Sequence, residues 1–431
     1  MPSVRDIELD VPSTATIDLV KKRACREFGI EPDLTSILLN GRLVDGKRRV
    51  ASLGLKQKPL TVDYLWARHL ILWGPEGQKR LRESTALVAG AGAIGNEVAK
   101  NLAMLGIKRL LIIDNDVVEL SNTSRMIFFD RKSQGLNKAE MLARGIISKF
   151  PHVEAIAWTG ALEDLPLEHF LTADVIVCGL DNVLSRIYLA QISRRYSIPM
   201  VDGGIIGYRG RVQTYVPPNM PCPLCTYPSA EYGRIAGLRN PCDGPIEETK
   251  VPSLPTTISL ISSIQCQEAT KIVVGYQSYL KNGIWPKETG EPLKGILMVD
   301  LQYNRYSLME IKRNKSCIVC GDNGLAQKPV QVLTIPIREL HDSSSQLHRV
   351  VAQEMRLTEQ QIMLFSQRRN GTTKIEKKRS LRRLQIRAGS IITVVTQDGA
   401  EYTEAIVRLS RSHISPTMSR DEAGKPMVAR A

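Results

Sequence analysis

The 431-residue chain has no uninterrupted apolar run long enough to span a bilayer, and we therefore expect no membrane-spanning segment. Its first ten residues, MPSVRDIELD, lack the apolar centre of a secretory signal peptide. Both absences predict a protein that stays in the cytoplasm.

Basic charge is abundant, but the aromatic residues that nucleic-acid binding uses beside such charge are missing. The net charge is +14, and the segment Ser366–Arg387 holds nine Lys/Arg against the single acid Glu376, so +8 lies there and only +6 elsewhere. No aromatic residue interleaves with these charges, so bases have nothing to stack on. We expect no nucleic-acid partner. An acidic protein partner and a solvated loop face both fit the segment.

Cysteine is present in a pattern typical of a metal site. The chain has eight cysteines, and four of them form two C-x-x-C pairs, Cys222/Cys225 and Cys317/Cys320, with 91 residues between the pairs. Their four thiolates are enough to hold one zinc ion. In a cytosolic protein this spacing favours zinc over disulfides, with a dithiol redox pair as the alternative. Nothing indicates an open coordination position, so we expect a structural zinc.

A nucleotide-binding pattern follows residue 85. The apolar run Ala86–Ala89 meets glycines in G-x-G-x-x-G spacing, a helical pattern follows, and a second apolar run ends at Asp114. Strand, tight turn, helix and strand with a terminal acid form the nucleotide-binding βαβ unit. The glycines let backbone N–H groups approach a phosphate, and Asp114, 24 residues after the first glycine, is placed to accept a ribose hydroxyl. The three glycines are Gly90, Gly92 and Gly95.

Polar residues also cluster where later strands are expected to end. Asp181 directly follows an apolar strand, so its carboxylate should project at the carboxyl edge of the sheet, where α/β ligands bind. Cations for phosphate oxygens and a carboxylate for magnesium would together form a polyphosphate site. The cluster consists of Asp116, Asn122, Arg125, Lys138, Asp181, Asn182 and Arg186.

Strands that alternate with helices predict an α/β core with a Rossmann-like, mostly parallel sheet covered on both faces. The long apolar helix Ser253–Val274 is expected to end at Gly275. The N-terminal part reads as an alternating strand over residues 4–11, a helix, and strands joined at Asn40-Gly41 and Asp45-Gly46. This order resembles the ubiquitin-like β-grasp fold, and a similar order returns near the C-terminus. We therefore expect four parts. Residues 1–63 and 328–412 would each form a small α+β domain of ubiquitin-like type, residues 64–327 would form the core, and residues 413–431 would form a disordered tail.

From Tyr64 to Cys320 the chain resembles the adenylyltransferases that include ubiquitin-activating enzymes, MoeB and ThiF. The matching motifs are WARHLILWGPEGQKRL, GAGAIG, IIDND, SNTSR, GLNKAE, GLDN and the paired C-x-x-C. With ubiquitin-like patterns at both ends, the chain looks most like a compact archaeal-type ubiquitin-activating enzyme. The resemblance implies ATP and Mg²⁺ as cofactors, with magnesium on Asp181. It also implies a homodimer, in which Arg68 reaches the partner's nucleotide. The implied cofactor-binding residues are Gly90, Gly92, Gly95, Asp114, Asp116, Asn122, Arg125, Lys138, Asp181 and Asn182.

The implied reaction is adenylation of the C-terminal glycine of a ubiquitin-like protein, then thioester formation and transfer to a conjugating enzyme recruited by the C-terminal domain. Cys242 lies in a polar, proline-punctuated loop where the family places its acceptor cysteine, and an exposed thiol there can attack. An incidental loop cysteine is the alternative. In the ubiquitin-fold-modifier branch the cysteine stands just before Leu-Pro-Thr-Thr, whereas here Lys250 holds that place before Leu254–Thr257.

Three other functions compete with this interpretation. A sulfur-carrier adenylyltransferase would share every nucleotide residue but would not need the terminal ubiquitin-like domains. A nicotinamide-dependent dehydrogenase would use Asp114 but leave Arg125, Lys138 and Asp181 without purpose. A scaffold presenting two β-grasp modules would leave the whole phosphate-site set unexplained.

Overall fold

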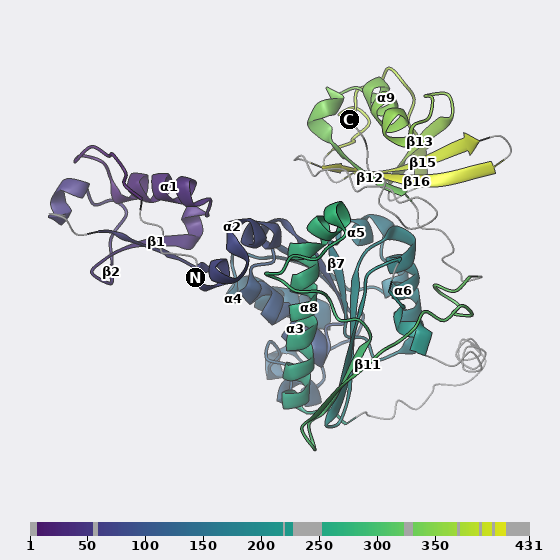
Figure 1. Cartoon of the computed structure of the whole chain (residues 1–431), viewed down its shortest axis with the longest axis horizontal. Coiled ribbons are helices and arrows are strands. Elements are labelled where there is room, and N and C mark those ends of the chain that lie inside the picture. The colour runs from purple at the N-terminus through teal and green to yellow at the C-terminus, as the bar shows by residue number, and fades with distance from the viewer. Residues whose placement is uncertain are drawn as a thin grey trace.

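The computed structural model describes residues 7–54, 59–218, 220–226, 252–322, 331–368, 371–387, 390–398 and 401–410. A central α/β unit carries one small unit to its side and another over one end (Figure 1). Among the described residues, no helix has the length and apolar character needed to cross a membrane.

The N-terminal unit packs one helix on a three-stranded sheet. Helix α1 (Ile17–Phe28) begins where the hydroxyl of Thr16 accepts the N–H of Leu19 and ends at Gly29 in the left-handed conformation. The antiparallel sheet has the order β2 (Arg42–Leu43), β1 (Thr35–Leu39), β3 (Thr61–Tyr64). Short 3₁₀ turns η1 (Pro32–Leu34) and η2 (Val50–Leu53) complete it.

Two sequence-based expectations meet opposite outcomes in this unit. Asn40 and Gly41 both have positive φ, 52° and 75°, which is the geometry of a two-residue hairpin turn, so that turn is confirmed. The strand expected over residues 4–11 is wrong in its described part, because residues 7–11 form no strand. Leu9 and Val11 instead pack on the small core around Ile17. The alternating apolar pattern therefore predicted which side chains face the core, but not that the segment would form no strand.

An eight-stranded sheet forms the centre of the molecule. Strands β8, β7, β4, β5 and β6 run parallel, and β9, β10 and β11 extend the sheet as antiparallel strands. The order β11-β10-β9-β8-β7-β4-β5-β6 changes direction between β4 and β7, which is where ligands bind in open α/β sheets. The strands are β4 (Thr85–Ala89), β5 (Arg109–Ile113), β6 (Glu154–Trp158), β7 (Val175–Cys178), β8 (Met200–Ile206), β9 (Arg209–Tyr215), β10 (Ile296–Asp300) and β11 (Arg305–Met309).

Helices cover both faces of this sheet, as the alternating pattern predicted. Along β4, Ala86 and Val88 face one buried cluster, while Leu87 and Ala89 face the other. The first cluster includes residues of α2 (Ala67–Glu83), α3 (Ala93–Leu105), α4 (Lys138–Lys149) and α8 (Pro255–Asn282), and the second includes residues of α5 (Leu167–Thr172) and α6 (Val183–Tyr196). Truncating a fully buried leucine in such a core typically costs about 2–5 kcal/mol of folding free energy. Short turns η3 (Leu120–Ser124), η4 (Arg131–Ser133), η5 (Leu162–Asp164) and η6 (Pro223–Thr226) connect these elements.

The long helix α8 corrects the expected stop at Gly275. It continues to Asn282 and ends at Gly283, whose φ is 73°. Gly275 is buried inside the helix, and a Cβ there would lie 3.0 Å from Trp285 and 3.1 Å from Pro286. The glycine therefore makes room for the loop that follows the helix and does not end it.

The C-terminal unit is a five-stranded sheet with one helix. Strand β12 (Gln331–Pro336) runs parallel to β16 (Glu401–Ser410), and the other pairs are antiparallel in the order β12-β16-β15-β13-β14. This α+β arrangement agrees with the expected class, and its ubiquitin-like character stays a prediction. The remaining elements are η7 (Ile337–Leu340), α9 (Ser344–Met355), β13 (Ile362–Arg368), β14 (Gly371–Lys374) and β15 (Ile391–Asp398).

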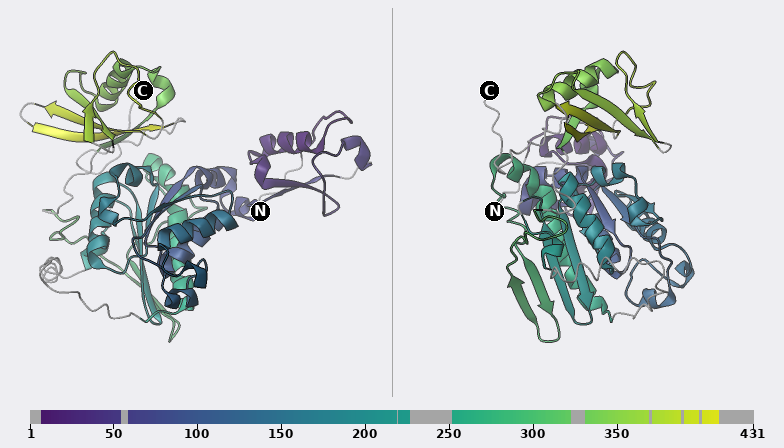
Figure 2. Two further views of the ribbon diagram at one scale, coloured as in Figure 1. Left: turned by 180° about the vertical axis from the view of Figure 1, so that it is seen from behind. Right: turned by 90° about the vertical axis from the view of Figure 1, so that its right-hand side faces the viewer.

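Each small unit contacts the central unit through few side chains, and the left view of Figure 2 shows them on separate sides of it. At the N-terminal joint only two residues separate β3 from α2. One of them, Trp66, is buried and donates its Nε1–H to the carbonyl of Met104 at 2.8 Å. Arg82 of α2 lies over the Trp66 ring and pairs with Glu31 at 2.9 Å. The C-terminal joint is a small apolar cluster of Leu171, Ile391 and Ile406, with Leu167 and Tyr196 packed against it.

Candidate functional site

The glycine loop between β4 and α3 has the geometry that close approach of a phosphate requires. Gly90 has φ of 93° and its N–H donates to the carbonyl of Ile113 at 2.8 Å. A Cβ on Gly95 would lie 1.8 Å from the Gly90 carbonyl oxygen, so only glycine fits there. Helix α3 starts at Gly92 with no side-chain cap, and a Cβ on Gly92 would meet nothing within 4 Å. An uncapped helix start beside open space is suited to an anion.

Asp114 ties this loop to the end of β5. Its Oδ2 accepts the N–H of Ala91 at 2.7 Å, and its Oδ1 accepts the N–H of Asp116 at 2.9 Å. Burial raises the pKa of Asp114, while the two backbone N–H groups and Lys138 oppose that shift. Each carboxylate oxygen can accept a second hydrogen bond, which is what a ribose hydroxyl would need.

The start of α4 brings the predicted phosphate lysine to the same place. Asn137 caps α4 and donates its side-chain N–H to the carbonyls of Asp114 and Asp116, at 3.0 and 3.2 Å. Lys138, the next residue, pairs with Asp116 at 2.8 Å. Asp114, Asp116 and Lys138 are thus brought together, as the sequence predicted.

Asn122 and Arg125 lie in the segment that crosses from β5 towards α4. The buried Asn122 accepts the N–H of Glu119 at 2.9 Å, and Arg125 donates to the carbonyl of Ser121 at 2.8 Å. Three residues further on, the N–H of Phe128 donates to Asn96 in the first turn of α3, at 3.2 Å. The segment is therefore attached to the helix that starts at the glycine loop.

The turn after β7 adjoins the glycine loop from the other side. The N–H of Gly179 donates to the carbonyl of Ala89 at 2.9 Å, and a Cβ on Gly90 would lie 3.3 Å from the Gly179 carbonyl oxygen. Asp181, two residues on, is exposed at the carboxyl edge of the sheet, as predicted. Asn182 is also exposed, and its side chain caps α6 by accepting the N–H of Ser185 at 2.8 Å.

For Arg68 and Cys242, two predicted catalytic residues, the described structure gives no contact with this cluster. Arg68 is exposed on the first turn of α2, ahead of the kink at Gly74. Cys242 lies outside the described residues, as does Lys250. The Leu254–Thr257 run is described and forms the start of α8.

The four predicted zinc ligands do come together. Their sulfur atoms all lie within 4.8 Å of one another, with separations of 3.3 Å for Cys225–Cys320 and 3.5 Å for Cys222–Cys317. Tetrahedral zinc with bonds of about 2.3 Å needs sulfurs about 3.8 Å apart, so the group fits that ion. The hydrogen bonds that the thiols share raise the pKa of Cys222 and lower the pKa of Cys320 to about 7.

The other described cysteines are unsuited to attack a substrate. Cys25, Cys178 and Cys266 are all buried, as expected. Burial raises the pKa of the Cys178 thiol to about 12 and also raises that of Cys266. A thiol with a raised pKa is rarely ionised at neutral pH, and the thiolate is the nucleophile.

A buried ion cluster was missed in part by the sequence analysis. Arg186 was expected near the phosphate site, but it pairs with the fully buried Asp202 at the end of the parallel part of β8, and Arg211 lies on the other side of that carboxylate. One signal was available, because Asp202 follows an apolar strand just as Asp181 does.

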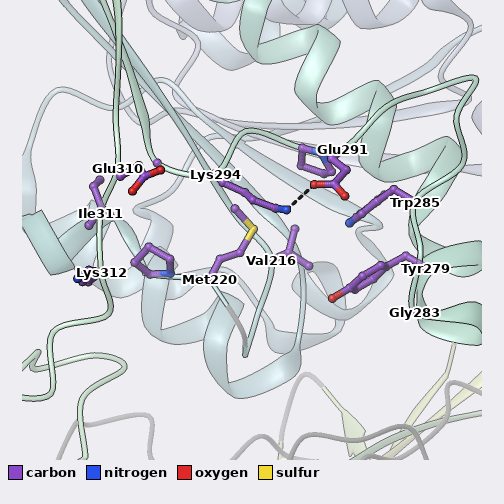
Figure 3. A pocket seen from close by; sticks show the side chains of 13 residues that line it. Val216, Met220, Tyr279, Gly283, Trp285, Glu291, Lys294, Glu310, Ile311 and Lys312 are labelled. Carbon is purple, nitrogen blue, oxygen red and sulfur yellow. Dashed lines mark ion pairs between the residues drawn. The ribbon is translucent and has the colours of Figure 1, made fainter.

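A separate cavity lies elsewhere in the described part of the chain (Figure 3). A cavity of about 530 Å³ is lined by Tyr279 and Trp285, with the ion pair of Lys294 and Glu291 at its edge. Ser262 of α8 bonds to Ile94 beside the glycine loop, and the 17 residues from there to Tyr279 span about 26 Å of helix. The cavity is therefore remote from the cluster described above.

Comparison of the sequence with known proteins finds a matching domain family and relatives named as activating enzymes and adenylyltransferases. The ubiquitin family matches residues 2–63. The SAMP-activating enzyme E1 of Haloferax volcanii is 31% identical over 271 residues, which cover 60% of this chain and 89% of that protein. Adenylyltransferase and sulfurtransferase MOCS3-1 of Zea mays is 28% identical, over 62% of this chain and 53% of that protein. The NEDD8-activating enzyme E1 catalytic subunit of Caenorhabditis elegans is 30% identical, over 36% and 39%.

The chain thus spans most of the archaeal relative and about half or less of the other two. The ThiF family matches residues 66–319, which is more than half of the chain and contains the glycine loop, Asp181 and three of the four clustered cysteines, ending one residue before Cys320. The chain therefore belongs to the ThiF family and carries a ubiquitin-like domain at its N-terminus.

Proposed function

We propose that this enzyme activates a ubiquitin-like protein by adenylating its C-terminal glycine, then takes it onto Cys242 as a thioester and passes it to a conjugating enzyme. One observation carries the proposal: the glycine loop, Asp114 and Lys138 lie at the same carboxyl edge of the sheet as the turn that carries Asp181. The similarity to a SAMP-activating enzyme along 89% of its length points to the same chemistry.

The chemistry needs cations more than it needs a base. A glycine carboxylate is already ionised at neutral pH, so no residue has to remove a proton. The attacking carboxylate and the α-phosphate repel each other, and this repulsion must be offset by positive groups. The first N–H groups of α3 would bind phosphate oxygens, and Arg125 and Asn122 would add further contacts. Lys138 would exchange Asp116 for a phosphate oxygen. Magnesium held by Asp181 would neutralise charge on the departing pyrophosphate.

Cys242 is favoured as the acceptor for two reasons. The described cysteines outside the zinc cluster are buried, and two of them have a raised pKa. In the sequence, Cys242 belongs to the polar segment between η6 and α8, ahead of a helix whose Ser262 bonds to the first turn of α3.

A sulfur-carrier adenylyltransferase is the second candidate, because the maize relative is named an adenylyltransferase and sulfurtransferase. Adenylation would be the same in both cases. Only the next step differs, since Cys242 would then carry a persulfide, its outer sulfur atom transferred from a sulfane-sulfur donor that leaves as the thiol, and not the modifier.

Variants of Cys242 and Asp181 test the order of steps. Cys242→Ala should keep modifier-dependent ATP–pyrophosphate exchange and lose the reductant-sensitive adduct between enzyme and modifier. Asp181→Ala should lose both, because pyrophosphate without magnesium is a poor leaving group. Cys25→Ala, at a buried position in the N-terminal unit, serves as the matched control and should keep both.

The products decide between the candidates. Intact-mass measurement of the enzyme should find one modifier attached. A gain of a single sulfur atom would favour the sulfur-carrier function. An adduct that survives Cys242→Ala would assign the acceptor role to another cysteine.

A homodimer, zinc in the four-cysteine cluster and a cytoplasmic location complete the proposal. Ile71 and Leu72 are each 60% exposed on the same half of α2 as Arg68, which gives a partner subunit an apolar surface to cover.

A further inference from the structure

Directly behind the turn that carries Asp181 lies a cluster of the buried Arg186 and Asp202 with the half-buried Arg211. Asp202 is fully buried and pairs across the sheet with Cys178, the last residue of β7. One carboxylate oxygen accepts a hydrogen bond from Nη1 of Arg186, and the other lies 3.0 Å from Nη2 of Arg211. The two ion pairs thus hold Asp202 from both sides.

Arg186 connects this carboxylate to the turn. Its Nη2 donates to the carbonyl of Gly203 at 3.0 Å and to the carbonyl of Leu180, the residue just before Asp181. A planar guanidinium suits this task, because its donors point in fixed directions towards several acceptors at once. One side chain therefore joins the middle of β8, the start of α6 and the Leu180–Asp181 peptide.

The turn is also held from its opposite side. Gly179 donates to Ala89 of β4, and a Cβ on Gly90 would lie 3.4 Å from Cδ2 of Leu180. The backbone between Gly179 and Asn182 therefore lies between the glycine loop and Arg186. Asp181 and Asn182 are the exposed residues of this turn, whereas Gly179 and Leu180 are half-buried.

Stability alone is a weak reason for such a cluster. Well-packed apolar residues often replace buried ion pairs with no loss of stability, whereas removing one partner is costly. Groups that hold a metal ligand in place, in contrast, commonly change metal affinity by about 10–100-fold when they are mutated.

We propose that Arg186, itself held by Asp202, is a positioning residue that fixes the Leu180–Asn182 turn so that the Asp181 carboxylate faces the glycine loop. The inference rests on the proposed function, in which Asp181 holds magnesium beside the ATP phosphates. Arg186 acts through the turn and is not itself a contact of the nucleotide.

The test compares Arg186→Gln with a matched arginine. Arg82 also binds one carboxylate, that of Glu31, and two backbone carbonyls, those of Gly106 and His152, but in the N-terminal joint. Magnesium is titrated at fixed ATP, and ATP binding is followed by calorimetry in the wild-type chain, Arg186→Gln, Asp202→Asn and Arg82→Gln.

Both variants in the cluster should need about tenfold more magnesium than the wild type for half-maximal ATP binding. Arg186→Lys should recover only part of this loss, because an ammonium group is a point charge without the fork geometry. Arg82→Gln should lower the melting temperature but change the magnesium requirement less than about twofold. A wild-type magnesium requirement in Arg186→Gln, whatever its melting temperature, would overturn the inference. If Arg186→Gln does not fold, Arg186→Lys and Asp202→Asn decide in the same way.

A second readout does not depend on nucleotide binding. Amide hydrogen exchange at Asp181 and Asn182 should be faster in Arg186→Gln than in the wild type, with no change at residues of α4. Unchanged exchange at the turn would refute positioning even if the wild type failed to bind ATP. Failure of the wild type to bind ATP would itself count against the proposed function.

Discussion

At the scale of single residues, glycines decide whether the nucleotide loop can close. Gly95 and Gly92 are both in the motif, but their surroundings differ. A Cβ on Gly95 would collide with the carbonyl oxygen of Gly90, whereas a Cβ on Gly92 would enter open space. The φ of Gly92 is −68°, which any residue adopts.

Gly95→Ala should therefore lower the free energy of unfolding by about 1–3 kcal/mol, because α3 must move away from the loop. It should also abolish ATP binding. Thermal unfolding and calorimetry with Mg²⁺ and ATP measure the two effects. Gly92→Ala is the matched control for stability and should leave the melting temperature nearly unchanged. A Gly95→Ala protein as stable as the wild type would contradict the tight fit.

At the scale of elements, the joint between β3 and α2 joins the ubiquitin-like domain to the family core. His152 packs edge-on against Trp66 with ring centroids 5.1 Å apart, and its Nε2 lies 3.3 Å from the carbonyl oxygen of Ala103. Burial, and then the Arg82 charge, lower the pKa of His152. The folded state therefore favours the neutral ring.

Stability from this joint should fall as the solution is made acidic. The contribution is fully present above the unfolded-state pKa of about 6.5 and is lost as pH falls from there through the lowered folded-state pKa. The drop in melting temperature from pH 7.5 to pH 5.5, measured at constant salt, should be smaller for His152→Gln than for the wild type. His341→Gln, at an exposed position, is the control and should keep the wild-type difference. Equal pH dependence in all three proteins would remove His152 from the explanation.

At the scale of the whole molecule, the C-terminal unit and the candidate site occupy opposite edges of the sheet. The contact residue Leu171 lies just before β7 begins, while the glycine loop follows the end of the parallel strand β4. Basic residues such as Arg382 and Arg383 are exposed on this unit. We expect the C-terminal unit to recruit the conjugating enzyme.

Truncation after Leu325 should preserve adenylation and thioester formation but slow transfer to the conjugating enzyme by about tenfold or more. Raising salt from roughly 0.05 to 0.5 M should slow transfer by the intact enzyme, because screening shortens the reach of its charge. Charge reversal at Lys377, Lys378, Arg382 and Arg383 should mimic truncation. Single-turnover transfer assays measure all three. Normal transfer by the truncated enzyme would refute this role, and loss of adenylation would place the unit within the catalytic core.

The expected homodimer gives a second prediction at this scale. Arg68→Ala and Asp181→Ala should each be inactive alone. A heterodimer of the two has one site with both residues intact, so it should recover about half of the wild-type exchange rate. Tagged heterodimers, purified and assayed for pyrophosphate exchange, provide the measurement. Confirmed heterodimers without activity would mean that Arg68 does not act across subunits.

Local features of the chain were determined by the sequence itself. The glycine spacing, the Asn40-Gly41 turn, the helix Lys138–Lys149 and the paired cysteines all depend on residue types at short, regular distances. These features can be predicted without knowledge of the tertiary structure, because φ preferences, helix caps and ligand spacing act within a few residues. The alternation of strands and helices likewise predicted the covered parallel sheet.

Contacts between distant segments were decided only by the tertiary structure. The strand order placed Asp202 behind the Asp181 turn, and Arg186 then donates to three acceptors, two in β8 and one in the turn after β7. Gly275 was expected to end the helix by local rules. It lies inside the helix instead, where the absence of a side chain lets Trp285 pack against it. Residues 7–11 kept their apolar contacts but gained no strand partner. In each case the outcome depends on which other segments pack against the residue, and composition and local spacing do not specify those segments.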